Sequence, residues 1–227
     1  MASTCVSVLD VCAIRVAKLT ESGAPLPGAL NGYVSDAPIT LSVTLTLEDG
    51  DDLVLKNGCG NIAATYQSPD LIKGVELNLE LTDLDAELLG LLTGSTVFMD
   101  GGDAIGGALP EAGSSPPPVY FEAWSKAWQG DSQVSHTSTT PDATWIHWVF
   151  PLTRWTQGDI ELSHDFAVIP VTGKGQGNKN ATVDGVWDDF PVAVAAAGGI
   201  TSPMGWFYDV AAPPAECDYV PVTTIPS

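Results

Sequence analysis

Residues 39–47 carry the feature that most constrains the fold, a strict alternation of apolar and hydroxylated side chains. The apolar members are Ile39, Leu41, Val43, Leu45 and Leu47, and the hydroxylated members between them are Thr40, Ser42, Thr44 and Thr46. Successive side chains of a β-strand point to opposite faces of a sheet, so the pattern predicts a strand with one buried and one solvated face.

A second alternation lies at residues 75–81. Its apolar members are Val75, Leu77, Leu79 and Leu81, and its polar members are Glu76, Asn78 and Glu80. This segment therefore predicts another half-buried strand, whose solvated face is acidic. Further strands are predicted at residues 11–19, 53–55, 120–128 and 145–150, and a segment at 160–171 follows a turn at 157–159.

One helix is predicted with a clear start and stop. Thr82 or Asp83 can cap its first turn, where acidic side chains also suit the helix dipole. Gly94 stands where a helix-ending glycine belongs. The apolar stripe between them consists of Leu84, Leu88, Leu91 and Leu92.

Glycine, proline and acidic residues mark the predicted turns and loops. Residues 48–52 read Glu-Asp-Gly-Asp-Asp and predict a solvated hairpin tip, and Asn57-Gly58 predicts a second turn. Residues 100–118 predict a long surface loop or arm. The glycines at 173–177 predict a flexible loop, and residues 173–227 an irregular C-terminal region.

This order of elements favours a mainly β fold, a β-sandwich or barrel with one short flanking helix and long loops. We expect residues 1–227 to form a single domain, because no stretch separates two independent cores. A chain of 227 residues can bury a proper core without metal or disulfide staples.

The chain is strongly acidic, with 28 Asp and Glu against 8 Lys and Arg and a formal net charge of -20. Residues 48–111 hold 13 acidic and 2 basic side chains and so carry -11 of this charge. Phosphate binding depends on Lys and Arg, so affinity for nucleic acid or anionic lipid is not expected, although DNA could pass nearby without sticking. No secretory signal and no apolar stretch of about 20 residues is visible, so no membrane partner is expected.

No residue pattern predicts a catalytic, cofactor or metal site. The glycines at 173–177 miss the spacing of nucleotide-binding loops, and residues 48–52 lack the spaced ligands of a calcium loop. The four cysteines form no C-x-x-C pair and are expected to be reduced structural thiols, with a Cys5–Cys12 disulfide left open. They are Cys5, Cys12, Cys59 and Cys217.

The histidines and one pair of aspartates are the candidate catalytic groups. His136, His147 and His164 are scattered, and His147 is expected to be a packed or half-exposed side chain of an aromatic strand. Asp188-Asp189 favours a loop or interface role over a hydrolytic pair. The chain is therefore not expected to be an enzyme.

Five of the seven tryptophans lie close together in the sequence. A platform of exposed, coplanar rings would suit a carbohydrate-binding module, but aromatic pairs also stabilise sheets and interfaces. We favour a role in the core or a subunit interface. The five are Trp124, Trp128, Trp145, Trp148 and Trp155.

Several segments together resemble the major tail protein, or tail tube protein, of long-tailed bacteriophages that infect actinobacteria. The first reads Leu-x-Leu-Lys-Asn-Gly-Cys-Gly-Asn-Ile at residues 53–62, and another reads Phe-Glu-Ala-Trp-Ser-Lys at 121–126. Similar segments occur in the same order at residues 70–79, 87–94 and 148–154, and more loosely at 172–178.

The resemblance implies a tail-tube fold whose subunits form stacked, hexameric rings around a channel for DNA ejection. It implies a virion protein that is assembled in the host cytoplasm, with tape measure and tail terminator proteins as further partners. The implied lumen-facing residues are Thr40, Ser42, Thr44, Glu76, Asn78 and Glu80. The implied inter-subunit loop holds Glu48, Asp49, Asp51, Asp52 and Asn57.

Two other classes of protein remain as alternatives. A capsid decoration or head-tail joining protein shares the acidic β character and differs in ring geometry and location. A carbohydrate-binding β-sandwich module requires exposed, coplanar tryptophans, whereas the tube hypothesis requires most of them to be buried. An enzyme would require a deep pocket with convergent titratable groups.

Overall fold

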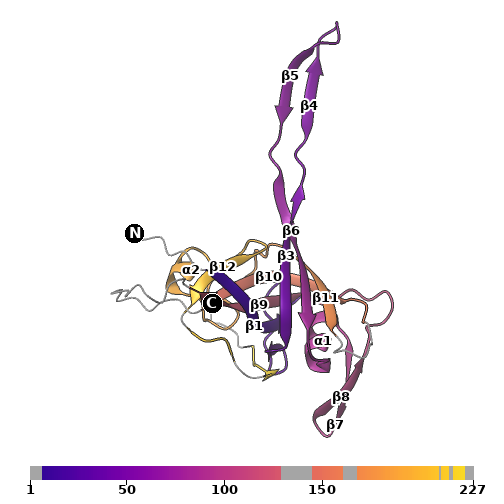
Figure 1. Cartoon of the computed structure of the whole chain (residues 1–227), viewed down its shortest axis with the longest axis vertical. Coiled ribbons are helices and arrows are strands. Elements are labelled where there is room, and N and C mark those ends of the chain that lie inside the picture. The colour runs from indigo at the N-terminus through magenta and orange to yellow at the C-terminus, as the bar shows by residue number, and fades with distance from the viewer. Residues whose placement is uncertain (1–6, 129–144, 161–167, 210, 215–216, 223–227) are drawn as a thin grey trace.

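The computed structural model forms one nine-stranded antiparallel sheet and two separate hairpins (Figure 1). It describes residues 7–128, 145–160, 168–209, 211–214 and 217–222. The sheet strands are β1 (Ser7–Lys18), β2 (Gly32–Ser35), β3 (Pro38–Glu48), β6 (Leu71–Leu81), β9 (Val119–Trp128), β10 (Trp145–Gln157), β11 (Ile169–Gly175), β12 (Gly205–Asp209) and β13 (Asp218–Tyr219). With 52% strand and 7% helix, the chain confirms the predicted mainly β fold.

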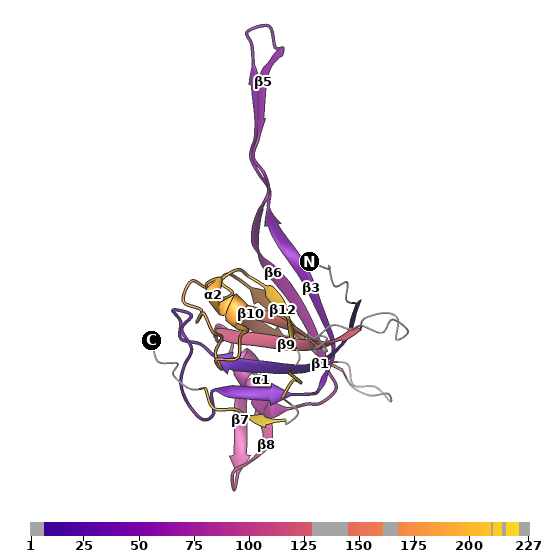
Figure 2. The same ribbon diagram turned by 90° about the vertical axis from the view of Figure 1, so that its left-hand side faces the viewer.

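The sheet order joins distant parts of the chain. Eight strands follow the order β13-β2-β1-β9-β10-β11-β6-β3, and β12 pairs with the first half of β10. The sheet curls, so that its last strand, β3, also contacts β1. Figure 2 shows the strands turning relative to one another, with a long hairpin rising from β3 and β6.

The inward face of the curled sheet holds the main core. Large, fully buried side chains of β6, β9 and β10 pack together here with helix α1 (Ala86–Thr93). Burying each side chain of this size contributes about 1.5–3 kcal/mol. They are Leu77, Leu79, Phe121, Phe150 and Trp155, with Leu88 and Leu92 of the helix.

Helix α1 begins later than the sequence predicts. Its N-cap is Asp85, whose side chain accepts hydrogen bonds from the backbone N–H groups of Glu87 and Leu88. Thr82 is already engaged, because its N–H and hydroxyl both donate to the carbonyl of Ala37. The helix ends as predicted, with Gly94 in the left-handed conformation at φ 79°.

Residues 178–200 cover the other face of β1, β9 and β10, and we call them the cover segment. They include helix α2 (Val192–Ala196), which the sequence did not predict. Val186 of this segment is buried against Phe207 of β12. The expectation of an irregular C-terminal region is therefore wrong in part, because β12 and β13 gain their structure by pairing with β10 and β2.

The glycines at 173–177 were predicted to form a flexible loop, but Gly173 and Gly175 lie inside β11. A Cβ atom at Gly173 would lie 2.7 Å from the ring of Trp155, and one at Gly175 would lie 2.5 Å from Val75 Cγ2. These glycines allow the backbone of β11 to pass close to the core.

The two hairpins project from opposite ends of the molecule (Figure 1). The longer one continues β3 and β6 into β4 (Asp52–Lys56) and β5 (Ile62–Gln67), and we call residues 48–71 the arm. The shorter one, the end hairpin, joins β7 (Thr96–Asp100) to β8 (Asp103–Ala108). It corrects the first part of the predicted loop at 100–118, because Gly101-Gly102 forms a turn with positive φ between two paired strands. Residues 109–118 lie outside helices and strands, as predicted.

Candidate assembly surface

The six residues predicted to share a solvated face do share one. In the ladder between β3 and β6, the opposed pairs are Thr40–Glu80, Ser42–Asn78 and Thr44–Glu76. All six side chains are exposed. The hydroxyl of Thr40 donates to Glu80 Oε2 at 2.9 Å, which links the two strands on this face. Their place in a lumen stays a prediction.

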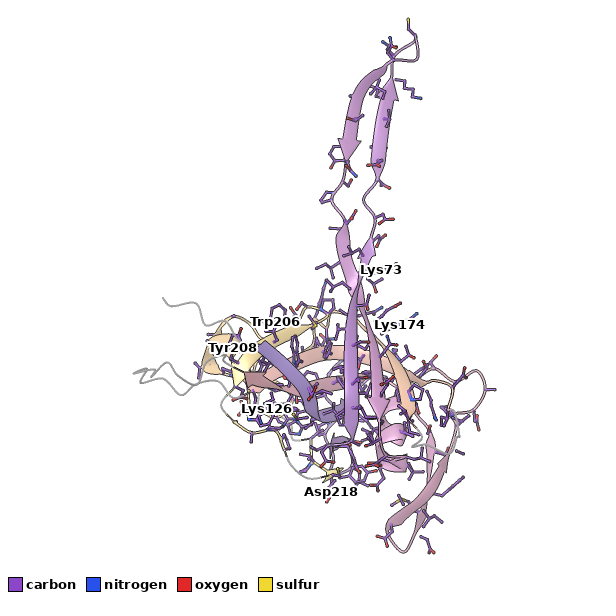
Figure 3. The ribbon with its side chains drawn as sticks, in the orientation of Figure 1. Lys73, Lys126, Lys174, Trp206, Tyr208 and Asp218 are labelled. Carbon is purple, nitrogen blue, oxygen red and sulfur yellow. The ribbon has the colours of Figure 1, made fainter. Side chains whose placement is uncertain are left out.

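This polar face continues onto β11 and β10, where sequence reasoning missed two positive charges. Lys174 lies opposite both Glu76 of β6 and Arg154 of β10 (Figure 3). The glycine-rich composition led us to predict a loop here. The alternation within β11, where Val171 is buried and Lys174 is exposed, is the signal that could have identified a strand. The face is therefore polar and mixed in charge, with acids toward its β6 side.

The guanidinium of Arg154 already donates hydrogen bonds to two partners. It donates to Glu21 Oε2 at 2.8 Å and to the carbonyl of Pro116 at 2.6 Å. Glu21 is an exposed residue, so this ion pair is solvated and contributes little to stability. Its effect on the polar face is to reduce the positive charge that Arg154 presents.

The acidic residues predicted to form a hairpin tip instead lie at the base of the arm. Gly50 N–H donates to Asp70 Oδ1 at 3.0 Å, and Ser68 N–H donates to the carbonyl of Asp51 at 3.0 Å. These bonds join the two sides of the arm across the break between β3 and β4, so the chain runs on without reversing. The five predicted loop residues are therefore divided, with Glu48, Asp49, Asp51 and Asp52 at or near the base and Asn57 at the tip.

The true tip of the arm is the turn that Asn57-Gly58 predicts. Asn57 Oδ1 accepts hydrogen bonds from the N–H groups of Cys59 and Asn61, at 3.1 and 2.9 Å. The backbone N–H of Asn57 also donates to the carbonyl of Asn61 at 2.8 Å. A side chain that bonds its own turn in this way fixes the tip without help from the rest of the fold.

The arm exposes large apolar side chains along its whole length. Each of the following is more than 60% exposed: Leu53, Leu55, Ile62, Tyr66 and Leu71. Single exposed apolar residues are normal, whereas large exposed apolar patches are typical of interaction sites. A two-stranded hairpin is also marginally stable alone in water, so a partner surface would stabilise it.

The apolar face of β3 is also incompletely covered. Val43 and Leu45 keep 37% and 54% of their surface exposed, whereas the opposed Leu77 on β6 is fully buried. They line a cleft of about 650 Å³ together with Val11, Trp148, Phe150 and Met204. Among the described strands, β3 is paired on one side only, with β6. An unpaired strand with an exposed apolar face is a surface that another chain can cover.

Behind the sheet, Arg15 of β1 is held between two carboxylates and two indole rings. Its Nε donates to Glu122 Oε2 at 2.6 Å, and its Nη2 donates to Asp189 of the cover segment. The guanidinium carbon lies 3.8 Å from the ring centre of Trp187 and 5.1 Å from that of Trp124. The predicted loop role of Asp189 is thereby confirmed, and its ion pair fastens the cover segment to the sheet.

The pKa values of the two carboxylates in this buried cluster shift in opposite directions. Burial alone would raise the pKa of Glu122, but the charges of Arg15 and His147 outweigh it and hold that pKa below its usual value. For Asp189, burial and the charge of Glu122 prevail and raise the pKa. His147 is 1% exposed and its Nε2 lies 3.3 Å from Glu122 Oε1, which confirms the predicted packed histidine.

The tryptophans whose side chains are described divide between core and surface. Trp124 and Trp155 are buried, Trp145, Trp148 and Trp187 are half-buried, and Trp206 on β12 is 57% exposed. The rings of Trp148 and Trp206 are inclined by 41°, so this pair is not coplanar as a sugar-stacking platform requires. Figure 3 shows Trp206 beside Tyr208 at the margin of the sheet. The side chain of Trp128, and His136 and His164, lie outside the described residues.

The described part of the chain contains three free cysteines, Cys12, Cys59 and Cys217, and the latter two are exposed. Cys5 lies outside it, so the proposed Cys5–Cys12 disulfide stays a prediction. No group of three or more His, Cys, Asp or Glu residues within the described ranges is placed to hold a metal ion. None of the helices described is long and apolar enough to cross a membrane.

Comparison with known proteins adds no family to these observations. No protein-family model matches the chain, and no curated protein matches it. The functional conclusion therefore depends on the surfaces described above.

Proposed function

We propose that this chain is a structural subunit that assembles with copies of itself into stacked rings, forming a hollow phage tail tube through which DNA is ejected. The observation that carries this proposal is the arm, an isolated hairpin on which five large apolar side chains are more than 60% exposed. Such a surface gains stability only when another chain covers it. A second copy of the chain is available wherever the protein is made.

Two further features support a ring. The open edge of β3 can pair with a strand of a neighbouring subunit, which would remove the unpaired edge. If the sheet continues around a ring in this way, its polar face lines the inside or the outside of the wall. The resemblance described above favours the inside, where Glu76 and Glu80 would repel DNA phosphates and let the genome slide.

Sedimentation velocity and negative-stain electron microscopy over a range of protein concentrations test this proposal. Rings or hollow tubes with a central channel are the expected result. Single particles at every concentration contradict self-assembly by the chain alone. Single particles that coat empty capsids would instead favour the capsid decoration hypothesis.

A matched pair of variants on the arm makes the test specific. Leu55→Asp places a charge in the exposed apolar row, whereas Thr65→Asp places the same charge on a polar position of the same hairpin. We expect Leu55→Asp to weaken association at least tenfold and Thr65→Asp to change it much less. Equal effects of the two variants would show that charge on the arm, and not its apolar surface, controls assembly.

A further inference from the structure

A groove lies at the end of the molecule opposite the arm, between the end hairpin, the start of α1 and β13. Its volume is about 910 Å³. Its apolar wall includes Leu30, Leu84, Val97, Met99, Ile105 and Tyr219. Figure 1 shows the end hairpin and the arm pointing away from each other, and Figure 3 shows Asp218 of β13 at the same end as the groove. We call this the end groove.

The end groove is open and partly apolar. Ile105 is 68% exposed, Leu84 is 69% exposed and Met99 is 52% exposed. Gly102 and Gly106 line the groove, and a Cβ atom at either position would meet nothing within 4 Å. The groove therefore offers both apolar contact surface and space for the backbone of another segment.

Four carboxylates also line the end groove: Asp85, Glu87, Asp103 and Asp218. Burial and the neighbouring charges of Asp85, Asp218 and Asp103 raise the pKa of Glu87. Among the described residues that line the groove there is no lysine or arginine. A segment that brings a positive charge would relieve this mutual repulsion, whereas an acidic segment would increase it.

The tip of the arm has the complementary character. Within residues 53–62 the only charged side chain is Lys56, and the apolar residues include Leu53, Leu55 and Ile62. In a chain of net charge -20 with 8 basic residues, such a segment is unusual. The acidic residues of the arm, Glu48, Asp49, Asp51, Asp52 and Asp70, lie near its base and away from this tip.

The positions of tip and groove suit a repeating contact. About ten residues of extended chain separate Glu48 from Gly58, which is roughly 30 Å at 3.3 Å per residue. The arm therefore reaches well beyond the sheet in one direction, while the end groove opens at the other end. A contact between two different surfaces of the same chain repeats from copy to copy, so it builds a stack and not a closed pair.

From this geometry we infer that the arm tip of one copy docks in the end groove of the next copy along the stack, with Lys56 facing the carboxylates and Leu53, Leu55 and Ile62 covering the apolar wall. The inference rests on the proposed self-assembly and names its axial contact. The cleft beside β3 is the competing receptor. Of the described residues that line it, Asp10 alone is charged, so this cleft gives Lys56 fewer partners than the end groove.

Disulfide trapping from the native thiol at the arm tip distinguishes the two receptors. The background keeps Cys59 and replaces Cys5, Cys12 and Cys217 with serine. One variant adds Ile105→Cys in the end groove, and the matched control adds Leu45→Cys in the cleft beside β3. Both sites are exposed apolar residues. Assembled protein is oxidised mildly, and products are separated on a denaturing gel without reductant.

We expect a ladder of dimers, trimers and higher products for I105C and none for L45C. A ladder for L45C alone, equal ladders for both, or no ladder in protein that sediments as an assembly overturns the inference and leaves self-assembly standing. Protein that remains monomeric in sedimentation contradicts the proposed function itself. Failure of the proposed contact is therefore seen on the gel, and failure of the proposed function is seen in sedimentation.

A charge exchange tests the role of Lys56 independently. Lys56→Glu is expected to weaken association about tenfold, because it sets a carboxylate among four others. The matched control Lys73→Glu makes the same change at the base of the arm and is expected to alter association less than threefold. Combining Lys56→Glu with Asp103→Lys in one chain should restore at least half of the loss. Equal effects of the two single variants, or no recovery, contradict the contact.

Discussion

The sheet and the arm are built from the same two runs of chain, yet they bury their apolar residues to opposite extents. Leu77 and Leu79 of β6 are fully buried, while Leu53 and Leu55 on the arm are 63% and 65% exposed. Both regions are antiparallel ladders, and each pair of leucines lies on one face of its strand. An apolar face can therefore be recognised in the sequence of a strand, but the sequence does not show whether the partner of that face belongs to the same chain.

The two regions should therefore respond differently to mutation, and the buried charges of the sheet give the largest expected difference. Arg15→Met removes the cation that Glu122 faces in a fully buried position. We expect a loss of about 3–5 kcal/mol in the free energy of unfolding, because an uncompensated buried charge remains. Urea unfolding followed by tryptophan fluorescence measures it. A loss below about 1 kcal/mol would show that the cover segment is not held by this cluster.

Leucine truncation compares the regions directly. Leu79→Ala should lower the free energy of unfolding by about 2–5 kcal/mol, since it leaves a cavity in a packed core. Leu55→Ala should change the unfolding of the monomer by less than about 0.5 kcal/mol and act on assembly instead. Urea unfolding at a concentration where both proteins are monomeric gives both values. Similar losses would mean that the arm folds back onto its own sheet.

Acidic pH should act on the buried charged cluster behind the sheet. The pKa of Glu122 is lowered in the folded state, so its contribution is fully present above the unfolded value of about 4.5 and is lost as pH falls through the folded pKa. Asp189, with a raised pKa, acts in the opposite sense and partly offsets this loss. Thermal unfolding of wild type and Glu122→Gln between pH 3 and pH 7 measures it. The variant should show a shallower decline in acid, and parallel curves would exclude Glu122 as the cause.

The smallest effect on stability is expected on the polar face. Replacing Glu76 and Glu80 with lysine alters two exposed side chains, so unfolding should shift by less than about 0.5 kcal/mol each. Assembly should be retained, but DNA passage should slow because the wall becomes attractive to phosphate. Ejection kinetics from particles that carry the variant provide the measurement. Unchanged kinetics would place this face outside the lumen.

Much of the sheet could be predicted, because its signals are local. The alternations at 39–47 and 75–81 predict β3 and β6, and the shared polar face of Thr44 and Glu76 follows once the strands are adjacent. The helix was predicted with the right end and a start that was too early. Asp85 takes the cap because Thr82 is bonded to Ala37, a contact between residues 45 positions apart.

The remaining elements could not be predicted from local sequence patterns, because their conformation depends on what packs against each segment. Gly173 and Gly175 have the composition of a loop, and only the nearness of Trp155 and Val75 gives them a place in a strand. The acidic run at 48–52 has the composition of a hairpin tip, but its bonds to residues 68–70 make it the base of a longer arm. Local patterns indicate whether a backbone turns or extends, whereas long-range pairing decides where each strand and hairpin ends.

By itself, the sequence determined the mainly β class, the positions of the two alternating strands and the acidity that makes tight binding of DNA unfavourable. These properties follow from side-chain period and charge, which each segment carries wherever it lies. Only the tertiary structure decided that Leu77 is covered while Leu55 is not, and that the basic arm tip and the acidic end groove lie at opposite ends. Burial and separation depend on the path of the whole chain, because they are set by residues far apart in sequence.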